Sequence, residues 1–291
     1  MVVYLNGAFL PPDEAHLSPL DRGFLFGDGI YEVIPSYQGR FFLLDEHIAR
    51  LRRSLREILM PEPQPDQGWA GLLEQLLGLN PGGDRSVYLQ VTRGAAPRDH
   101  TFPKSTAATV FAMVSPNAPS SPDLSERGMA AILLPDQRWG RCDIKAVALL
   151  PNVLARQQAV EQGAVEALLL RDGMLTEGAA SNVFVVSGGA VVTPPLGQEI
   201  LPGVTRRFLL DTLREEGWDC RENPVPESVL RSADEIWLTS STKELLPVTA
   251  LDGRPVGGGR PGPVWKGALD VFRRARDRSM ASAAAGANRD E

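Results

Sequence analysis

The chain has 291 residues, of which 43% are hydrophobic and 23% are charged, as is usual for a globular protein. A formal net charge of −6 without any run of basic residues argues against a nucleic-acid partner. No stretch approaches the roughly 18 apolar residues of a membrane span, and the first residues lack the features of a signal peptide. Two cysteines favour a reducing, cytoplasmic setting, and the three histidines show no metal-binding spacing.

The N-terminal part of the chain predicts alternating strands and helices. Asn6-Gly7 lies between two apolar runs and predicts a β-hairpin with a type I′ turn. A second strand pair is expected around Gln38-Gly39, followed by a helix that Asp45 could cap. The buried face of this helix is marked by apolar residues at helical spacing, namely Ile48, Leu51, Leu55 and Ile58. Another helix is expected over 69–80, and strands over 86–94 and 107–115.

Residues 116–128 are rich in proline, serine and asparagine and form the best candidate for a linker. Beyond it, a helix is expected over 152–163, with Asn152 as its cap and Gly163 at its end. Two strand pairs are expected to turn at Asp172-Gly173 and Gly188-Gly189. The remaining expected elements are a strand over 129–139, a helix over 205–217, a strand over 233–242 and a helix over 263–278.

These elements indicate an α+β protein with strands and helices in both halves. The linker divides the chain into an N-terminal domain over 1–118 and a larger C-terminal domain over 119–280. Residues 281–291 are small and polar and are expected to form a disordered tail. No internal repeat is visible, which excludes a solenoid.

Lys145 ends the short charged run "RCDIK" and is followed at once by the apolar run "AVALL". Burying a charged ammonium group in an apolar segment is costly, so this lysine needs an explanation. One interpretation is a lysine at a strand end whose stem packs while its ammonium group reaches water. The other is a desolvated amine with a lowered pKa, which is nucleophilic near neutral pH and can form a Schiff base.

A Schiff-base lysine commonly serves pyridoxal phosphate, which also needs an anion at its pyridine nitrogen and a phosphate site. Glu177 lies between a strand and a turn of small residues and could supply the anion. Gly203 and Thr205 stand at the start of a helix, where backbone amides bind anions. A run of hydroxyl-bearing residues over 239–242 ends a later strand.

Seven stretches occur in an order that resembles the fold type IV PLP-dependent aminotransferases. They are "DRGFLFGDGIYEV", "DEHIARL", "VTRGAAPRDHTFP", "RCDIKAVALL", "TEGAASNVF", "LPGVTR" and "LTSSTKE". The resemblance implies a smaller N-terminal α/β domain and a larger, PLP-binding C-terminal domain with a β-barrel-like core. It also implies pyridoxal 5′-phosphate as the cofactor and a homodimer with its active site at the subunit interface.

By this resemblance, Lys145 is the Schiff-base lysine and the general base that moves the substrate's Cα proton. Glu177 binds the pyridine nitrogen, and Leu201 packs against the cofactor ring. The residues implied to bind the phosphate or its surroundings are Arg50, Val204, Thr205, Ser240 and Ser241. For Arg50 the helical periodicity alone indicates a solvated side chain, whereas the resemblance indicates a cofactor cleft, which we favour.

Within the family, the pair in "PRDH" resembles the D-amino acid transaminases. There Arg98 and His100, contributed by the neighbouring subunit, would bind the substrate's α-carboxylate together with Tyr31. A guanidinium group binds a carboxylate through two parallel hydrogen bonds, which gives this assignment a physical basis. Val33 is implied to line the side-chain pocket. The sequence departs from its relatives at Ala179 and Ala180, where serines are common, which puts the local hydrogen bonds to the cofactor in question.

The expected activity is transfer of an amino group from a D-amino acid, with D-alanine as donor, to 2-oxoglutarate by a ping-pong mechanism. Three alternatives are left open: a branched-chain L-amino acid aminotransferase, a lyase acting on aminodeoxychorismate, and a PLP-binding protein without catalytic activity. The expected small-molecule partners are amino acids and keto acids, with no membrane partner.

Overall fold

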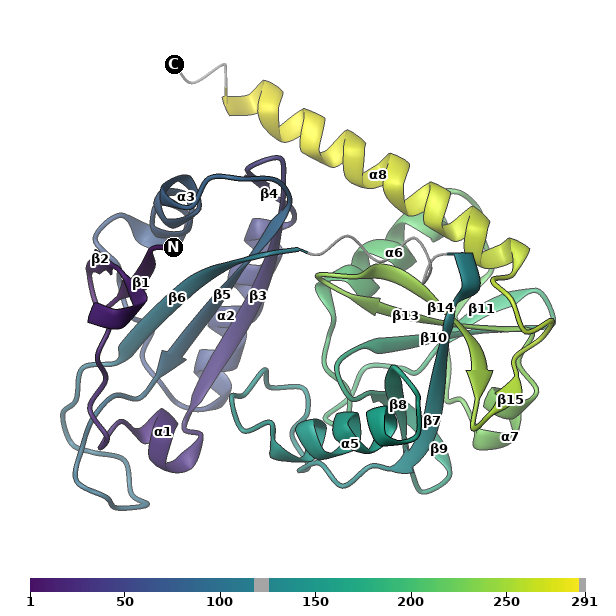
Figure 1. Ribbon diagram of the computed structural model, residues 1–291, viewed down its shortest axis with the longest axis horizontal. Coiled ribbons are helices and arrows are strands. Elements are labelled where there is room, and N and C mark those ends of the chain that lie inside the picture. The colour runs from purple at the N-terminus through teal and green to yellow at the C-terminus, as the bar shows by residue number, and fades with distance from the viewer. Residues whose placement is uncertain (118–125, 288–291) are drawn as a thin grey trace. The chain divides into compact units, whose positions relative to one another are not determined.

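A computed structural model describes residues 1–117 and 126–287 (Figure 1). The chain divides into two compact units. The first unit comprises Met1–Ala118 together with Ile144–Leu149, and the second comprises Pro119–Asp143 together with Leu150–Glu291. Most of the linker expected over 116–128 lies outside the described residues. Among those described, no helix is both long and apolar enough to cross a membrane.

The first unit is built on a six-stranded antiparallel sheet with the order β2-β1-β6-β5-β3-β4. Its strands are β1 (Val3–Leu5), β2 (Ala8–Leu10), β3 (Gly29–Tyr37), β4 (Arg40–Phe41), β5 (Arg85–Thr92) and β6 (Thr109–Pro116). The hairpin predicted at Asn6-Gly7 joins β1 and β2, and both residues have positive φ, of 48° and 100°, as a type I′ turn requires.

The helical elements of the first unit are η1 (Pro12–Glu14), α1 (Arg22–Phe26), α2 (Leu44–Glu57) and α3 (Gly68–Leu79). The predicted apolar face of α2 packs with α3 into the core on the sheet, and Ile48, Leu51 and Leu55 are buried there. The predicted cap of α2 is wrong. Leu43, in the left-handed conformation, precedes the helix, and Asp45 lies within its first turn.

The second unit contains a nine-stranded mixed sheet, which is curled (Figure 1). Its strands are β7 (Met129–Pro135), β8 (Glu166–Arg171), β9 (Met174–Gly178), β10 (Asn182–Ser187), β11 (Ala190–Thr193), β12 (Cys220–Glu222), β13 (Glu235–Ser240), β14 (Glu244–Leu251) and β15 (Arg254–Pro255). The turns predicted at Asp172-Gly173 and Gly188-Gly189 join β8 to β9 and β10 to β11. The core of the second unit is apolar, and Ile236 and Leu168 are fully buried in it.

The helices of the second unit are α5 (Leu150–Glu161), α6 (Val204–Glu215), α7 (Glu227–Arg231) and α8 (Pro263–Ala287). The cap predicted for α5 is wrong, because Asn152 lies inside the helix and its Nδ2 donates to the carbonyl oxygen of Ala179, 2.8 Å away. Helix α8 extends to Ala287 and so includes much of the tail expected over 281–291, of which 288–291 lie outside the described residues.

Candidate active site

Lys145 lies in the segment Ile144–Leu149, which belongs to the first unit. Its carbonyl oxygen accepts a hydrogen bond from the backbone N–H of Tyr31, 2.9 Å away, and its own N–H donates to Ser54 Oγ at 3.4 Å. The Nζ atom stands 4.2 Å from the centre of the Tyr31 ring. The apolar run after Lys145 is not buried throughout as expected, since Ala148 and Leu150 are exposed. The backbone contacts with β3, rather than burial of that run, therefore position the amine.

A buried charged cluster, formed by Glu32, His47 and Arg50, lies beside β3. Arg50 donates from Nε and Nη2 to the two carboxylate oxygens of Glu32, at 2.8 and 2.7 Å. His47 Nδ1 is 2.8 Å from Glu32 Oε2. Burial raises the pKa of Glu32, but the charge and hydrogen bonds of Arg50 and His47 outweigh it and lower that pKa to about 2. Burial also lowers the pKa of His47, although Glu32 opposes this shift.

The solvated position that periodicity alone indicates for Arg50 is wrong, because only 7% of the residue is exposed. Helix α2 has a second buried face with His47, Arg50 and Ser54, of which His47 and Arg50 contact Glu32 on the sheet. The burial is tolerated because Glu32, on the strand below, provides a counter-charge with two hydrogen bonds. The role of Arg50 in phosphate binding stays a prediction.

Tyr31 and Val33 share a sheet face with two residues that the sequence did not single out. In the antiparallel pairing of β3 with β5, Tyr31 lies opposite Gln90 and Val33 lies opposite Tyr88. The rings of Tyr31 and Tyr88 stack 5.6 Å apart, and Tyr88 donates to Gln90 Oε1 at 2.6 Å. Burial, with a smaller effect from Tyr31, raises the pKa of Tyr88 to about 12. Alternation along "VYLQV" was the signal that could have identified this pair.

Arg98 and His100 lie on an exposed loop after β5 and contact Phe26, the last residue of α1. The Phe26 ring is 5.4 Å from the His100 ring and 5.3 Å from the guanidinium carbon of Arg98. Asp21 caps α1 by accepting a hydrogen bond from the N–H of Gly23 at 2.8 Å. The structure thus brings Arg98 and His100 together against the ring of Phe26. Their contact with a substrate stays a prediction.

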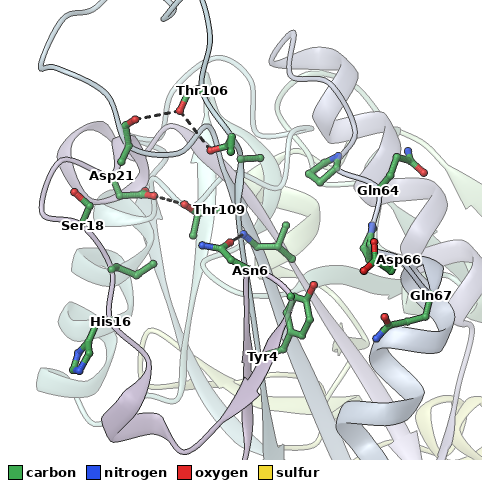
Figure 2. Close-up of a pocket in the computed structure, with 18 residues that line it drawn as sticks. Tyr4, Asn6, His16, Ser18, Asp21, Gln64, Asp66, Gln67, Thr106 and Thr109 are labelled. Atoms are coloured by element: carbon green, nitrogen blue, oxygen red, sulfur yellow. Dashed lines mark hydrogen bonds between the residues drawn. The ribbon is translucent and has the colours of Figure 1, made fainter.

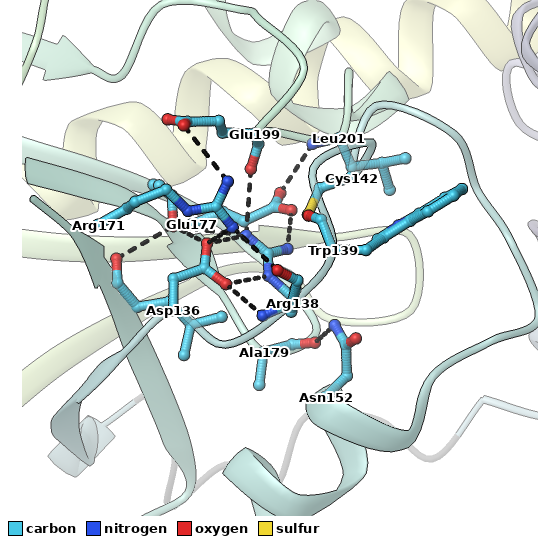
Figure 3. A network of polar contacts seen from close by, with 12 residues as sticks. Asp136, Arg138, Trp139, Cys142, Asn152, Arg171, Glu177, Ala179, Glu199 and Leu201 are labelled. Atoms are coloured by element: carbon cyan, nitrogen blue, oxygen red, sulfur yellow. Dashed lines mark hydrogen bonds and ion pairs between the residues drawn. The ribbon is translucent and has the colours of Figure 1, made fainter.

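Glu177, in the second unit, is held by donors on three sides (Figure 3). Its Oε1 forms an ion pair with Arg138 Nη1. Its Oε2 accepts hydrogen bonds from Asn182 Nδ2 at 3.0 Å and from the N–H of Leu201 at 3.1 Å. The side chain is nearly fully buried, so these donors stabilise a negative charge that would otherwise be costly.

Arg138 is a central residue of this network that sequence reasoning missed. It donates from Nε and Nη2 to the buried carboxylate of Asp136, at 2.9 and 2.8 Å. Thr176 and Arg171 also contact Asp136, at 3.0 and 3.2 Å (Figure 3). Burial raises the pKa of Asp136, but the hydrogen bonds and charge of Arg138 lower it below its usual value. No local pattern in the sequence connects Arg138 with Glu177, which lies 39 residues further on.

The start of α6 presents unpaired backbone amides, as expected from its sequence. Val204 and Thr205 occupy the first turn, whose N–H groups have no partner within the helix. At Gly203, an added Cβ would lie 1.9 Å from Asn182 Oδ1, so only glycine fits against the residue that holds Glu177. The same asparagine donates to the carbonyl oxygen of Leu201 at 2.9 Å. Asn182 therefore connects the start of α6, Leu201 and Glu177.

The other predicted residues of the second unit lie at strand ends and turns. Ser240 is the last residue of β13, and Ser241 follows in the turn, both partly buried. Ala179 is buried and its N–H donates to the carbonyl oxygen of Ala167 at 2.9 Å, whereas Ala180 is exposed. The backbone of Ala179 is thus engaged through its own N–H.

A separate pocket of about 620 Å³ lies in the first unit (Figure 2). Its lining comes from the β1–β2 hairpin, the segment before α1, the segment before α3 and the start of β6, and includes Tyr4, His16 and Asp66. None of the predicted site residues lines it. We therefore do not place the active site there.

Comparison with known proteins identifies the family. Residues 29–251, well over half of the chain, match the family described as Amino-transferase class IV. This chain belongs to the class IV aminotransferases. Among its relatives, a D-alanine aminotransferase of Bacillus licheniformis is 42% identical over 266 residues, which cover 91% of this chain and 94% of that protein.

Solved structures of other aminotransferases share the fold of this class IV chain. A branched-chain amino acid aminotransferase of Escherichia coli has a TM-score of 0.85 at 24% identity and covers 93% of both chains. A hypothetical aminotransferase of Mycobacterium tuberculosis in a PLP-bound form has a TM-score of 0.82 at 26% identity, over 97% of this chain and 100% of that one. The fold expected from the resemblance is confirmed, and the protein is a PLP-dependent aminotransferase.

The residues present fit pyridoxal 5′-phosphate. The cofactor requires an amine, an anion for its pyridine nitrogen and a site for its phosphate. Lys145 supplies the amine, Glu177 supplies a carboxylate that three donors keep in place, and the first turn of α6 supplies free amides beside the buried hydroxyl of Thr205. The donor set therefore matches the chemistry of this class IV enzyme.

Proposed function

We propose that this class IV aminotransferase is a D-amino acid transaminase that moves the amino group of D-alanine to 2-oxoglutarate. The observation that carries the proposal is the 42% identity, over 91% of the chain, with a D-alanine aminotransferase. The M. tuberculosis aminotransferase noted above was also solved with alpha-ketoglutarate bound, which supports 2-oxoglutarate as the acceptor. The substrates of the family are amino acids and keto acids.

Each named side chain has a defined task in this proposal. When bound, the cofactor supplies the electron-poor ring that makes the substrate's Cα proton acidic. Lys145 Nζ takes that proton, and its place over the Tyr31 ring is set by the backbone hydrogen bond between the two residues. Glu177, fixed by Arg138, Asn182 and the N–H of Leu201, stabilises a positive charge on the nitrogen of the ring.

We further propose that Arg98 and His100 bind the α-carboxylate of a substrate held by the neighbouring subunit of a homodimer. The exposed loop and helix α1 carry large apolar side chains that a second subunit would cover, since Phe24 is 78% and Phe102 is 53% exposed. Leu17 and Leu20, also exposed, precede α1. Apolar groups beside the guanidinium group of Arg98 and the imidazole of His100 favour a contact in which the loop reaches into a partner's site.

A cytoplasmic location is part of the proposal. Among the described residues both cysteines are free, and one of them, Cys142, is buried with a raised pKa caused mainly by burial. Unpaired cysteines are usual in a reducing compartment.

A branched-chain L-amino acid aminotransferase is the second candidate, because several of the solved structures with this fold act on branched-chain amino acids. The two candidates are separated by initial rates with 2-oxoglutarate and either D-alanine or L-leucine. The proposal expects D-glutamate and pyruvate from D-alanine, with L-leucine at least about a hundredfold slower in kcat/KM. Faster turnover of L-leucine would establish the second candidate.

A further inference from the structure

Three charged residues form a cluster beneath the loop that carries Arg98 and His100: Arg22, Asp28 and Arg93. Asp28 Oδ2 accepts hydrogen bonds from Arg22 Nε at 2.7 Å and from Arg93 Nε at 2.8 Å. Both guanidinium groups are buried, with side-chain exposures of 4% and 7%. Burial raises the pKa of Asp28, but the hydrogen bonds and charges of Arg93 and Arg22 lower it below its usual value. The cluster is therefore a rigid group of charged residues on which the loop can rest.

Both arginines also contact the loop itself. Arg22 Nη1 donates to the carbonyl oxygens of Asp99 and Thr101, at 2.6 and 3.2 Å, which are the two residues that flank His100. The guanidinium carbon of Arg93 lies 3.8 Å from the centre of the Phe102 ring. One carboxylate thus orients two arginines, and each arginine fixes a different part of the loop.

The other end of the cluster is anchored to the body of the first unit. Arg93 donates to the carbonyl oxygens of Ile58 and Leu59, at 2.8 and 3.3 Å, where α2 has ended. The loop cannot be held by burial of its own side chains, because Arg98, Asp99 and His100 are all exposed. Its conformation must come from contacts such as those with Arg22 and Arg93.

We propose that the Arg22–Asp28–Arg93 cluster is a positioning device that fixes the Arg98–His100 loop for binding of the substrate's α-carboxylate. This inference rests on the proposed function. Bidentate recognition of a carboxylate needs a guanidinium group in a defined orientation, and a small misplacement weakens it steeply. The cluster gives the charged residues Arg22, Asp28 and Arg93 of the motifs "DRGFLFGDG" and "VTRG" a role through the loop.

Arg22→Lys tests the proposal most directly. A lysine keeps the charge beside Asp28 but cannot donate at once to that carboxylate and to both loop carbonyls. We expect KM for D-alanine to rise about tenfold, the equivalent of losing one hydrogen bond to a charged group, while kcat changes less than about threefold. The cofactor content should stay at its wild-type value. Phe102→Leu, which removes the exposed ring above Arg93, should raise KM about threefold.

Arg52→Lys is the matched control, because Arg52 forms an ion pair with Glu62 that is partly exposed and includes no residue of the cluster or the loop. Its KM and kcat should match the wild type. A double variant, Arg22→Lys with Arg98→Ala, separates positioning from general damage. If Arg22 acts through the loop, its substitution adds little to the effect of Arg98→Ala on KM.

The proposal is overturned if KM is unchanged in Arg22→Lys, or if the substitution raises KM by the same factor with and without Arg98. A wild-type enzyme that does not accept D-alanine would refute the proposed function instead. The same variants are then assayed with the amino acid that the enzyme does accept. An unchanged KM for that substrate overturns the positioning role as well.

Discussion

In the proposed function, Arg98 is the residue on which the choice of substrate depends most. Arg98→Ala should raise KM for D-alanine by roughly 10- to 100-fold, as expected when a charged hydrogen-bond donor to a carboxylate is removed. Steady-state kinetics at varied D-alanine and fixed 2-oxoglutarate measure this effect. Lys104→Ala is the control, because it removes a positive charge from the same exposed loop. Equal effects of the two substitutions on KM would mean that Arg98 contributes only its positive charge.

Glu32 makes stability depend on acidic pH. Its pKa is about 2 in the folded chain against 4.5 for the ordinary group, so the folded state favours the charged form. The contribution to stability is therefore complete above about pH 4.5 and is lost as the pH falls toward 2, amounting to about 3 kcal/mol in total.

Glu32→Gln should lower the free energy of unfolding at pH 7 by roughly 3 to 5 kcal/mol, because Arg50 stays buried without its counter-charge. The difference from the wild type should narrow as the pH falls from 4.5 to 3. Urea unfolding at several pH values measures both effects. Asp219→Asn, in an exposed pair with Arg221, should change little at any pH. If the difference in the free energy of unfolding between Glu32→Gln and the wild type did not depend on pH, the charge of Glu32 would not be what stabilises the fold.

At the scale of single elements, the start of α6 depends on Gly203. Gly203→Ala would place a methyl group on Asn182, which holds both Glu177 and the carbonyl oxygen of Leu201. We expect the affinity for pyridoxal phosphate to fall about tenfold or more, since the displacement disturbs the carboxylate and the helix start together. Cofactor titration followed by absorbance measures it. Gly197→Ala, where an added Cβ meets nothing within 4 Å, should bind the cofactor as the wild type does.

Local signals in the sequence predicted local structure well. Asn6-Gly7 and Asp172-Gly173 turn where expected, because few residues adopt positive φ without strain. The caps assigned to Asp45 and Asn152 were wrong for a different reason. A cap depends on which backbone groups remain free in the folded chain, and Asn152 instead bonds a carbonyl oxygen 27 residues away. Short-range patterns do not contain that information.

The candidate site shows the same difference between local patterns, which the sequence contains, and contacts between distant residues, which it does not. Lys145 and Glu177 were found because their chemistry and their motifs are distinctive. Arg138 and Glu32 were missed, since each becomes meaningful only through a partner that is distant in sequence, 39 and 18 residues away. Buried charges are recognised from their partners, and pairing is a property of the fold.

At the scale of the whole molecule, the chain returns to its first unit with Ile144–Leu149 after it has begun the second. Lys145 thus belongs to a compact unit other than the one that contains Glu177. The sequence alone, with its linker near residue 120, did not predict this return. It follows from the backbone hydrogen bonds of Lys145 and Val147 with β3.

If each subunit supplies its Arg98 loop to the partner's site, mixing two variants should restore activity that neither shows alone at D-alanine concentrations far below the raised KM of Arg98→Ala. In a hybrid of Lys145→Ala and Arg98→Ala subunits, one site has both Lys145 and the partner's Arg98. Random exchange of subunits at equal amounts should therefore give about a quarter of the wild-type activity. Activity is assayed after the two variants are mixed and incubated. No recovery, with dimers verified by sedimentation, would mean that Arg98 serves its own subunit.

The measurement that tests the central claim most directly is a half-reaction without a keto acid. The purified enzyme, loaded with pyridoxal phosphate, is mixed with D-alanine or with L-leucine, and the absorbance of the lysine-bound cofactor is followed. We predict that D-alanine abolishes this absorbance band and that L-leucine leaves it unchanged. Loss of the band with L-leucine alone would contradict the claim and place the enzyme among the branched-chain aminotransferases.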